Sequence, residues 1–138
     1  MRPLEIREST LQSLTVGAAA YALALIFLGA GAVKLGGLGM HTEHFARWGY
    51  PGWFVYVVGG AEVLLAVLVA HPGTRFTGAM GLLTIMAGAF ATHWIGAEYD
   101  LAQIPLLYGT LASLTALAAC PPHRVAPPVP RTVLAEVD

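Results

Sequence analysis

The stretch Leu14–Val33, LTVGAAAYALALIFLGAGAV, contains no charged residue. About 20 apolar residues in an α-helix are enough to cross a hydrocarbon core of about 30 Å. A cleaved signal peptide would have a shorter apolar core and a basic leader without acids, whereas Glu5 and Glu8 lie among the basic residues here. The stretch therefore predicts a membrane-spanning helix that the protein retains.

The composition of the chain also indicates a membrane protein. Of its 138 residues 57% are hydrophobic and 11% are charged, and a soluble domain of this size needs about twice that charge. Seven Lys and Arg stand against eight Asp and Glu, so no basic surface exists to attract nucleic acid. The only cysteine, Cys120, excludes an intramolecular disulfide, a CxxC redox pair and a cysteine-rich zinc site.

Three more apolar segments follow the first, at residues 53–70, 77–95 and 104–120. Each is about long enough to span, and glycine and proline turns separate them. Pro105 suits the first turn of the last segment. We therefore predict an all-α fold, a four-helix up-down transmembrane bundle with a short interfacial amphipathic stretch between its first two helices.

The distribution of Lys and Arg predicts the orientation, because these residues concentrate in cytoplasmic loops. Five lie in the two tails and the turn at residue 75, against two in the opposite loops: Arg2, Arg7, Arg75, Arg124 and Arg131 against Lys34 and Arg47. We expect a multi-pass protein of the cell membrane with a membrane domain at 14–120. Residues 1–13 and the proline-rich residues 121–138 then form cytoplasmic tails.

Glu62 lies in the middle of the second apolar segment. An ionisable side chain at this depth costs about 2.5–3.5 kcal/mol on insertion scales, so it needs a partner, a proton or water. Two interpretations stay open: a functional carboxylate, or a hydrogen-bonded Glu that only fixes helix packing. Lys34 ends the first helix and either extends to the headgroups or turns inward to form an ion pair with Glu62.

Four polar residues are expected in the outer half of the bundle, because the first and third helices end where the second and fourth begin. They are Lys34, His93, Gln103 and Tyr108. Together with Glu62 at the floor they predict a polar cavity that opens away from the cytoplasm. The alternative is that these residues only face lipid headgroups.

His41 and His44 share one helical face, a spacing compatible with metal ligation. A third ligand is not evident, and two such histidines in an interfacial loop are more often a surface feature. We therefore predict no metal site, and no nucleotide-binding or metalloprotease motif occurs either.

The chain resembles the DoxX and DoxX-like family over roughly residues 17–118. The resemblance rests on Gly-Ala-Val-Lys-Leu at 31–35, the stretch from His44-Phe45 to Gly49-Tyr50-Pro51, Gly60-Ala61-Glu62, and a third helix ending in His93. It implies a four-helix membrane bundle with Lys34, Glu62 and His93 as matching polar positions. Members are associated with thiosulfate:quinone oxidoreduction as a small subunit or with membrane complexes that handle oxidative stress, and most have no assigned activity.

Three functional hypotheses follow. The first is a small membrane subunit whose cavity binds a lipophilic molecule such as a quinone, with catalytic Glu62 and His93 and with Lys34, Gln103 and Tyr108 binding the substrate. Because the chain lacks a complete redox site, a quinone or a membrane or soluble redox partner protein must carry the electrons. The second is a cofactor-free membrane isomerase, cyclase or hydrolase that uses Glu62 and His93 as an acid–base pair. The third is a non-catalytic anchor or assembly factor.

Overall fold

The computed structural model describes residues 2–37 and 39–121, with the backbone alone for residues 2–10 and Gln12. This part of the chain is all-helical, without strands. Its five helices are α1 (Arg2–Leu35), α2 (Gly39–Arg47), α3 (Phe54–Ala70), α4 (Arg75–Ile95) and α5 (Tyr99–Ala118). Helix α2 is the amphipathic stretch expected between the first two apolar helices.

Three of these helices contain stretches long and apolar enough to cross a membrane: Ser13–Leu35, Arg75–Ile95 and Tyr99–Ala118. Helix α3 is equally apolar but has 17 residues. At 1.5 Å per residue it is about 25 Å long, somewhat less than a typical hydrocarbon core. The structure thus provides three candidate spans and one shorter apolar helix at the four predicted positions.

Two predicted boundaries differ from the structure. The apolar span begins at Ser13, close to the expected start, but α1 itself begins at Arg2, so residues 2–13 continue the helix. Pro3 is tolerated in the first turn, and no glycine or proline interrupts the following residues. Helix α5 begins at Tyr99, which places Pro105 inside the helix. The predicted tail at 121–138 lies outside the described residues from position 122.

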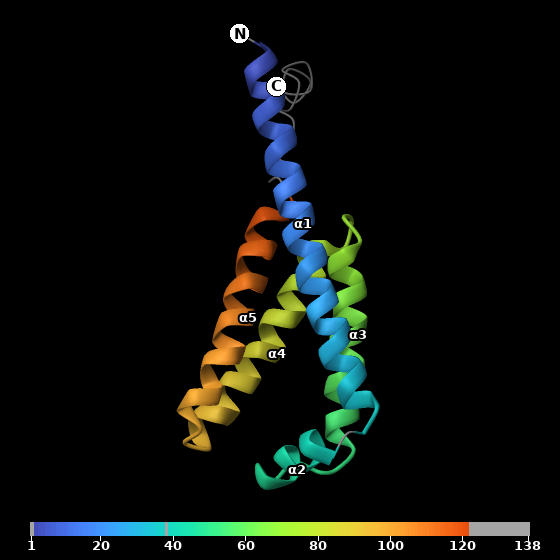
Figure 1. Ribbon diagram of the computed structural model, residues 1–138, viewed down its shortest axis with the longest axis vertical. Coiled ribbons are helices and arrows are strands. Elements are labelled where there is room, and N and C mark those ends of the chain that lie inside the picture. Colours follow the sequence, from blue (N-terminus) through green and yellow to red (C-terminus); the bar gives the residue numbers. More distant parts are fainter. Residues whose placement is uncertain (1, 38, 122–138) are drawn as a thin grey trace, which may run out of the picture.

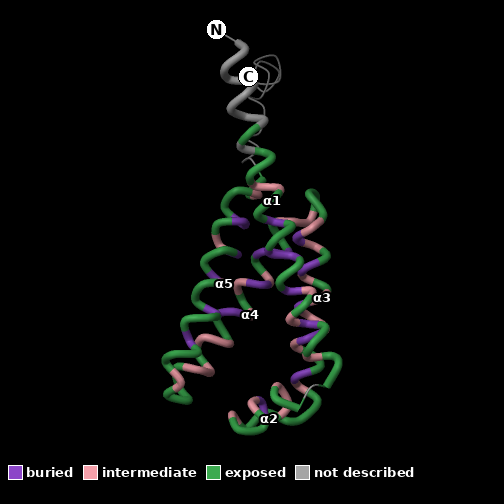
Figure 2. The backbone as a smooth tube through the Cα atoms, in the orientation of Figure 1, coloured by how far each residue is buried: buried purple, intermediate pink, exposed green. Residues whose placement is uncertain are grey.

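The helices pack in two pairs, α1 with α3 and α4 with α5. Figure 1 shows that the pairs meet where α3 turns into α4, and that they diverge towards the other end, where α2 lies across. The core fills the closed half, and Figure 2 colours the buried residues of the chain purple. It includes Leu23 and Phe27 of α1, Val69 of α3, Leu82 of α4 and Ala112 of α5.

The turn between α3 and α4 is held by side chains that bond to the end of α3. Thr74 Oγ1 donates to the carbonyl oxygen of Leu68 at 2.8 Å, and Arg75 Nε donates to that of Val69 at 3.1 Å. These bonds satisfy carbonyl groups that a helix end leaves without partners. The divergence of the two pairs therefore starts from a fixed corner.

Candidate ligand cavity

Two glycines bring α1 and α3 into close contact near the open half. A Cβ atom on Gly31 would lie 2.6 Å from the carbonyl oxygen of Gly59, and one on Gly59 would lie 2.8 Å from Cβ of Lys34. Only residues without a side chain permit this approach. The crossing places Lys34 of α1 directly beside Glu62 of α3.

Lys34 and Glu62 form a two-pronged ion pair. Lys34 Nζ donates to Oε2 of Glu62 at 2.7 Å and to Oε1 at 3.0 Å. Glu62 is 2% exposed, and the Lys34 side chain is 14% exposed. Of the two placements considered for Lys34, the structure has the inward ion pair, which gives the buried carboxylate a charged partner.

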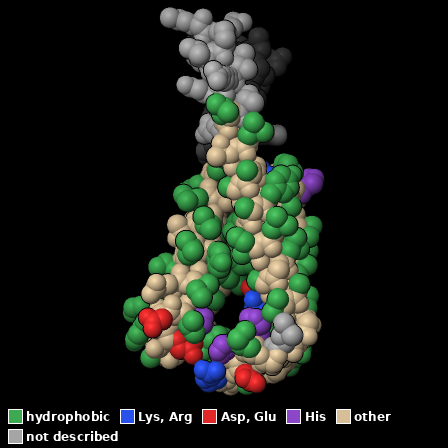
Figure 3. Space-filling model, viewed as in Figure 1, with side chains coloured by type: hydrophobic (Ala, Val, Ile, Leu, Met, Phe, Trp, Pro, Cys, Tyr) green, Lys and Arg blue, Asp and Glu red, His purple; other side chains and the backbone are tan. Residues whose placement is uncertain are grey.

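A cavity of about 480 Å³ lies between the diverging helix pairs. All five helices contribute to its walls, which are mainly apolar; Phe27, Phe54, Val58, Ile85 and Met86 are among the lining residues. Lys34, Glu62, His93 and Tyr108 also line it. Figure 3 shows this face of the molecule hollowed between the two pairs, with basic and His side chains visible at the hollow.

The cavity reaches the surface between α1 and α5. Ile26 of α1 and Leu101 and Ile104 of α5 line the cavity, yet are 39%, 38% and 52% exposed. Residues that border both the cavity and the outside mark its rim. Deeper in, Phe27 and Tyr108 meet edge to face with ring centroids 5.9 Å apart, which joins the two helices.

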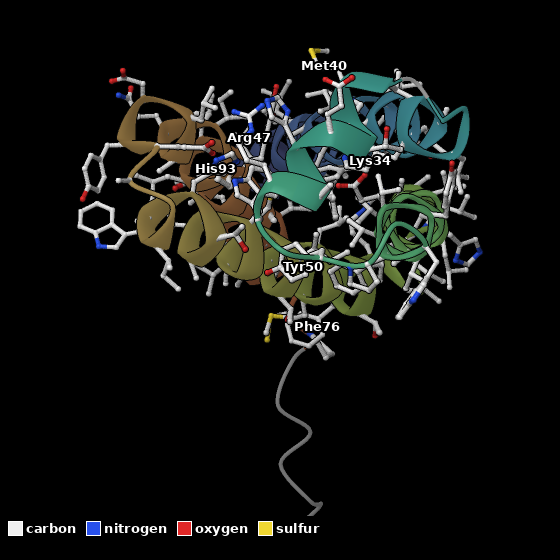
Figure 4. The ribbon with its side chains drawn as sticks, turned by 90° about the horizontal axis from the view of Figure 1, so that it is seen from below. Lys34, Met40, Arg47, Tyr50, Phe76 and His93 are labelled. Atoms are coloured by element: carbon white, nitrogen blue, oxygen red, sulfur yellow. The ribbon has the colours of Figure 1, made fainter. Side chains whose placement is uncertain are left out.

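Helix α2 closes the lower end of the cavity and is attached to the corner between α4 and α5 through Glu98. Trp48 Nε1 donates to Glu98 Oε2 at 3.1 Å, and His93 Nδ1 lies 2.9 Å from the same oxygen. Arg47 lies 3.8 Å from Oε1. Figure 4 shows α2 from below, with Arg47 and His93 close together at one of its ends.

A second contact joins the segment after α2 to α4. The hydroxyl groups of Tyr50 and Thr92 lie 2.9 Å apart, and the Tyr50 ring packs against Phe45 and Phe54. Phe45 is the buried anchor of α2. Together with the Glu98 contacts, these interactions hold the short helix over the cavity.

The charge of Glu98 is favoured by its surroundings. The hydrogen bond from His93 lowers the pKa of the Glu98 carboxyl group, and Trp48 and the positive charge of Arg47 lower it further, against partial burial. Glu98 is therefore ionised at neutral pH. An ionised carboxylate only accepts hydrogen bonds, so Nδ1 of His93 carries the hydrogen in this contact.

The predicted site residues are brought together with one exception. Lys34, Glu62, His93 and Tyr108 all line the cavity, whereas Gln103 is exposed and does not. On α5 the lining residues follow a helical stripe at positions 101, 104, 105 and 108. Gln103 lies on the opposite side of that helix, so its expected place in the cavity was wrong.

Glu62 and His93 do not share a hydrogen bond. Glu62 bonds to Lys34, and His93 bonds to Glu98. Glu98 itself was missed in the sequence, where it reads as one acid in a turn. The available signal was its position five residues after His93, just beyond the glycine that ends α4.

His41 and His44 take different roles in α2. His41 lines the cavity, where burial lowers its pKa and the charge of Lys34 and the neighbouring His44 lower it further. The His44 ring stacks on Trp48 with centroids 5.7 Å apart. Within residues 2–37 and 39–121, no group of three or more His, Cys, Asp or Glu side chains is arranged to hold a metal ion.

Comparison with known proteins connects this arrangement to one family. Neither the curated proteins nor the solved structures give a match to the chain. The model of the DoxX-like family, by contrast, matches residues 18–120, a range that contains the whole cavity. The chain therefore belongs to the DoxX-like family.

Proposed function

We propose that this protein binds a lipophilic small molecule, such as a quinone, in the cavity between its helix pairs. The observation that carries the proposal is an apolar cavity of about 480 Å³ with the Lys34–Glu62 pair and His93 in its wall. Pockets for small molecules commonly measure about 300–1,000 Å³ and combine apolar walls with a few polar groups. The volume accommodates a ring system with part of an apolar tail.

The proposal includes the membrane arrangement. Helices α1, α3, α4 and α5 cross the bilayer in an up-down order, and both termini lie in the cytoplasm. Helix α2 then lies at the outer interface, and the cavity occupies the outer half. Support comes from the three long apolar spans and from the rim between α1 and α5, where Ile26 and Ile104 face outward. A ligand dissolved in the bilayer reaches the cavity through this rim without passing through water.

In a redox role, the bound quinone or a partner protein carries the electrons, because the chain has a single cysteine and no nucleotide motif. Glu62 is the group we assign to proton exchange, with Lys34 holding it in place. The separate partners of Glu62 and His93 give no support to an acid–base enzyme that uses these two as a direct pair.

A matched pair of variants tests the cavity. Ala89 lines it, whereas Ala87 of the same helix is exposed and does not. In Ala89→Phe the ring fills the cavity, and we expect at least about tenfold weaker binding of 2,3-dimethyl-1,4-naphthoquinone, equivalent to a loss of about 1.4 kcal/mol. Quenching of tryptophan fluorescence in detergent-solubilised protein measures it. Ala87→Phe should bind like the wild type.

The proposal fails if the wild type does not bind the naphthoquinone, or if both variants weaken binding equally. The role of Glu62 is tested separately. Glu62→Gln should bind the naphthoquinone but lose any proton-linked reduction that the wild type supports, and equal behaviour would remove Glu62 from the mechanism.

A further inference from the structure

The contacts of His93 restrict how this residue meets a ligand. Its Nδ1 atom lies 2.9 Å from Oε2 of Glu98, and the rings of His93 and Trp48 meet in a T-shaped contact with centroids 4.8 Å apart and planes at 83°. Trp48 also donates to Oε2 of Glu98. Trp48 directly follows α2, His93 belongs to α4 and Glu98 to the turn before α5. Contacts from three segments therefore fix the position and the orientation of the imidazole ring.

The second ring nitrogen is available. In the neutral form of His93 the hydrogen is on Nδ1, because the Glu98 carboxylate only accepts, and Nε2 then presents a lone pair. Nε2 has no hydrogen-bond partner in the described part of the chain, and His93 lines the cavity with its side chain 15% exposed. This is the carboxylate–histidine arrangement in which one nitrogen is held so that the other can accept.

Three other polar side chains line the cavity beside His93 and are relevant to a ligand. Lys34 and Glu62 neutralise each other, so they add no net charge to the site. The hydroxyl group of Tyr108, which also lines the cavity, has no hydrogen bond to another described residue. It can donate to an oxygen atom of a ligand.

We infer that His93 Nε2 accepts a hydrogen bond from a ligand hydroxyl group, that Glu98 is the positioning residue for it, and that the cavity selects a lipophilic phenol or hydroquinone. A hydroxyl group on an aromatic ring supplies the donor that Nε2 requires. This inference rests on the proposed function, since it names the chemical class that the same cavity takes.

Two probes of nearly equal shape test it: 1-naphthol, which has the hydroxyl group, and 1-methoxynaphthalene, which lacks the donor. Isothermal titration calorimetry in detergent at neutral pH gives both affinities, each corrected for partition into micelles without protein. The wild type should bind 1-naphthol about tenfold more tightly than the methyl ether, the effect of one buried hydrogen bond. In His93→Phe the two affinities should become equal.

Variants at Glu98 separate positioning from folding. Glu98→Ala frees the imidazole to rotate and to change tautomer, so the preference for 1-naphthol should fall to about twofold or less. Glu98→Gln keeps a carbonyl oxygen that accepts from Nδ1, and it should restore most of the preference. General loosening of the site would weaken both probes alike and leave their ratio unchanged. Glu43→Ala, at an exposed acid of α2, is the control and should match the wild type.

The outcomes distinguish the two proposals. If the wild type binds neither probe, the proposed function and this inference both fail. If it binds both with equal affinity, the lipophilic cavity stands and the inference is overturned. A preference that survives intact in Glu98→Ala also overturns the positioning role of Glu98.

Discussion

Lys34 and Glu62 occupy equivalent places on their two helices, each three residues after the glycine at which α1 and α3 touch. Three residues along a helix is close to one turn, so each side chain lies next to the contact on the same face. The glycines Gly31 and Gly59 thus set the distance at which a buried carboxylate meets its cation. The packing of α1 against α3 and the ion pair between Lys34 and Glu62 therefore both depend on these two glycines.

The first prediction concerns this close contact. Gly59→Ala places a Cβ atom 2.8 Å from Cβ of Lys34, which the helices can relieve only by moving apart. We expect a loss of about 1–3 kcal/mol in the free energy of unfolding, the usual cost of overpacking. Unfolding of the purified protein by denaturing detergent measures it.

Gly60→Ala is the matched control, because a Cβ atom at Gly60 meets nothing within 4 Å. Alanine there should be neutral or raise the free energy of unfolding by up to about 1 kcal/mol, since it restricts the unfolded chain. Equal destabilisation by the two substitutions would contradict the role given to Gly59.

The second prediction concerns the ion pair. Lys34→Met leaves Glu62 buried without its cation, and breaking such a pair costs about 3–5 kcal/mol. If Glu62 takes up a proton in this variant, the loss in the free energy of unfolding lies towards the lower end of this range. The double variant Lys34→Met, Glu62→Gln removes the charge as well, so it should be more stable than Lys34→Met alone. A double-mutant cycle on the free energy of unfolding checks this, and simple additivity would argue against a coupled pair.

Much of this fold could be predicted because the hydrocarbon of a membrane imposes simple rules on the helices that cross it. Apolar runs located the four apolar helices, and the need to shelter a charge at half depth identified Glu62. The ion pair with Glu62 was one of the two placements that the sequence left open for Lys34. These inferences depend on composition and depth alone, which a sequence displays directly.

The remaining features depend on rotation about the helix axis and on contacts between distant segments. Gln103 was placed in the cavity by its depth, but its position around α5 turns it away. Glu98 is paired with Trp48, 50 residues earlier in the chain, and nothing in the local sequence indicates this contact. The apolar run located the start of the span near Ser13, but it did not indicate that α1 extends back to Arg2.

The third prediction concerns pH and the attachment of α2. The pKa of Glu98 is lowered in the folded state, so Glu98 contributes fully to holding α2 when the pH is above the ordinary pKa of about 4.3. This contribution is lost as the pH falls through the lower pKa of the folded state. Trp48 should therefore change its fluorescence when α2 is released below about pH 4. A chain with Trp53→Phe and Trp94→Phe leaves Trp48 as the only emitting tryptophan.

His41 in α2 also titrates, so the contribution of Glu98 needs its own control. The pKa of His41 is lowered as well, and its protonation beside Lys34 disfavours the closed position of α2 as the pH falls. In Glu98→Gln the effect of His41 remains, whereas the transition below about pH 4 should be absent. An identical acid titration in both proteins would show that Glu98 does not hold α2.

The fourth prediction concerns orientation, and the single cysteine makes it testable. Cys120 is exposed just after α5, and Glu43 is exposed on α2 at the other end of the helices. If both termini are cytoplasmic, a membrane-impermeant maleimide added to intact cells should leave Cys120 unlabelled until the membrane is permeabilised. In the variant Cys120→Ser, Glu43→Cys, labelling should occur in intact cells. Labelling of the two positions from the same side would contradict the up-down arrangement of α1, α3, α4 and α5, because Cys120 and α2 must then lie on one face of the membrane. The opposite pattern, with only Cys120 labelled in intact cells, would keep this arrangement and reverse the orientation derived from Lys and Arg.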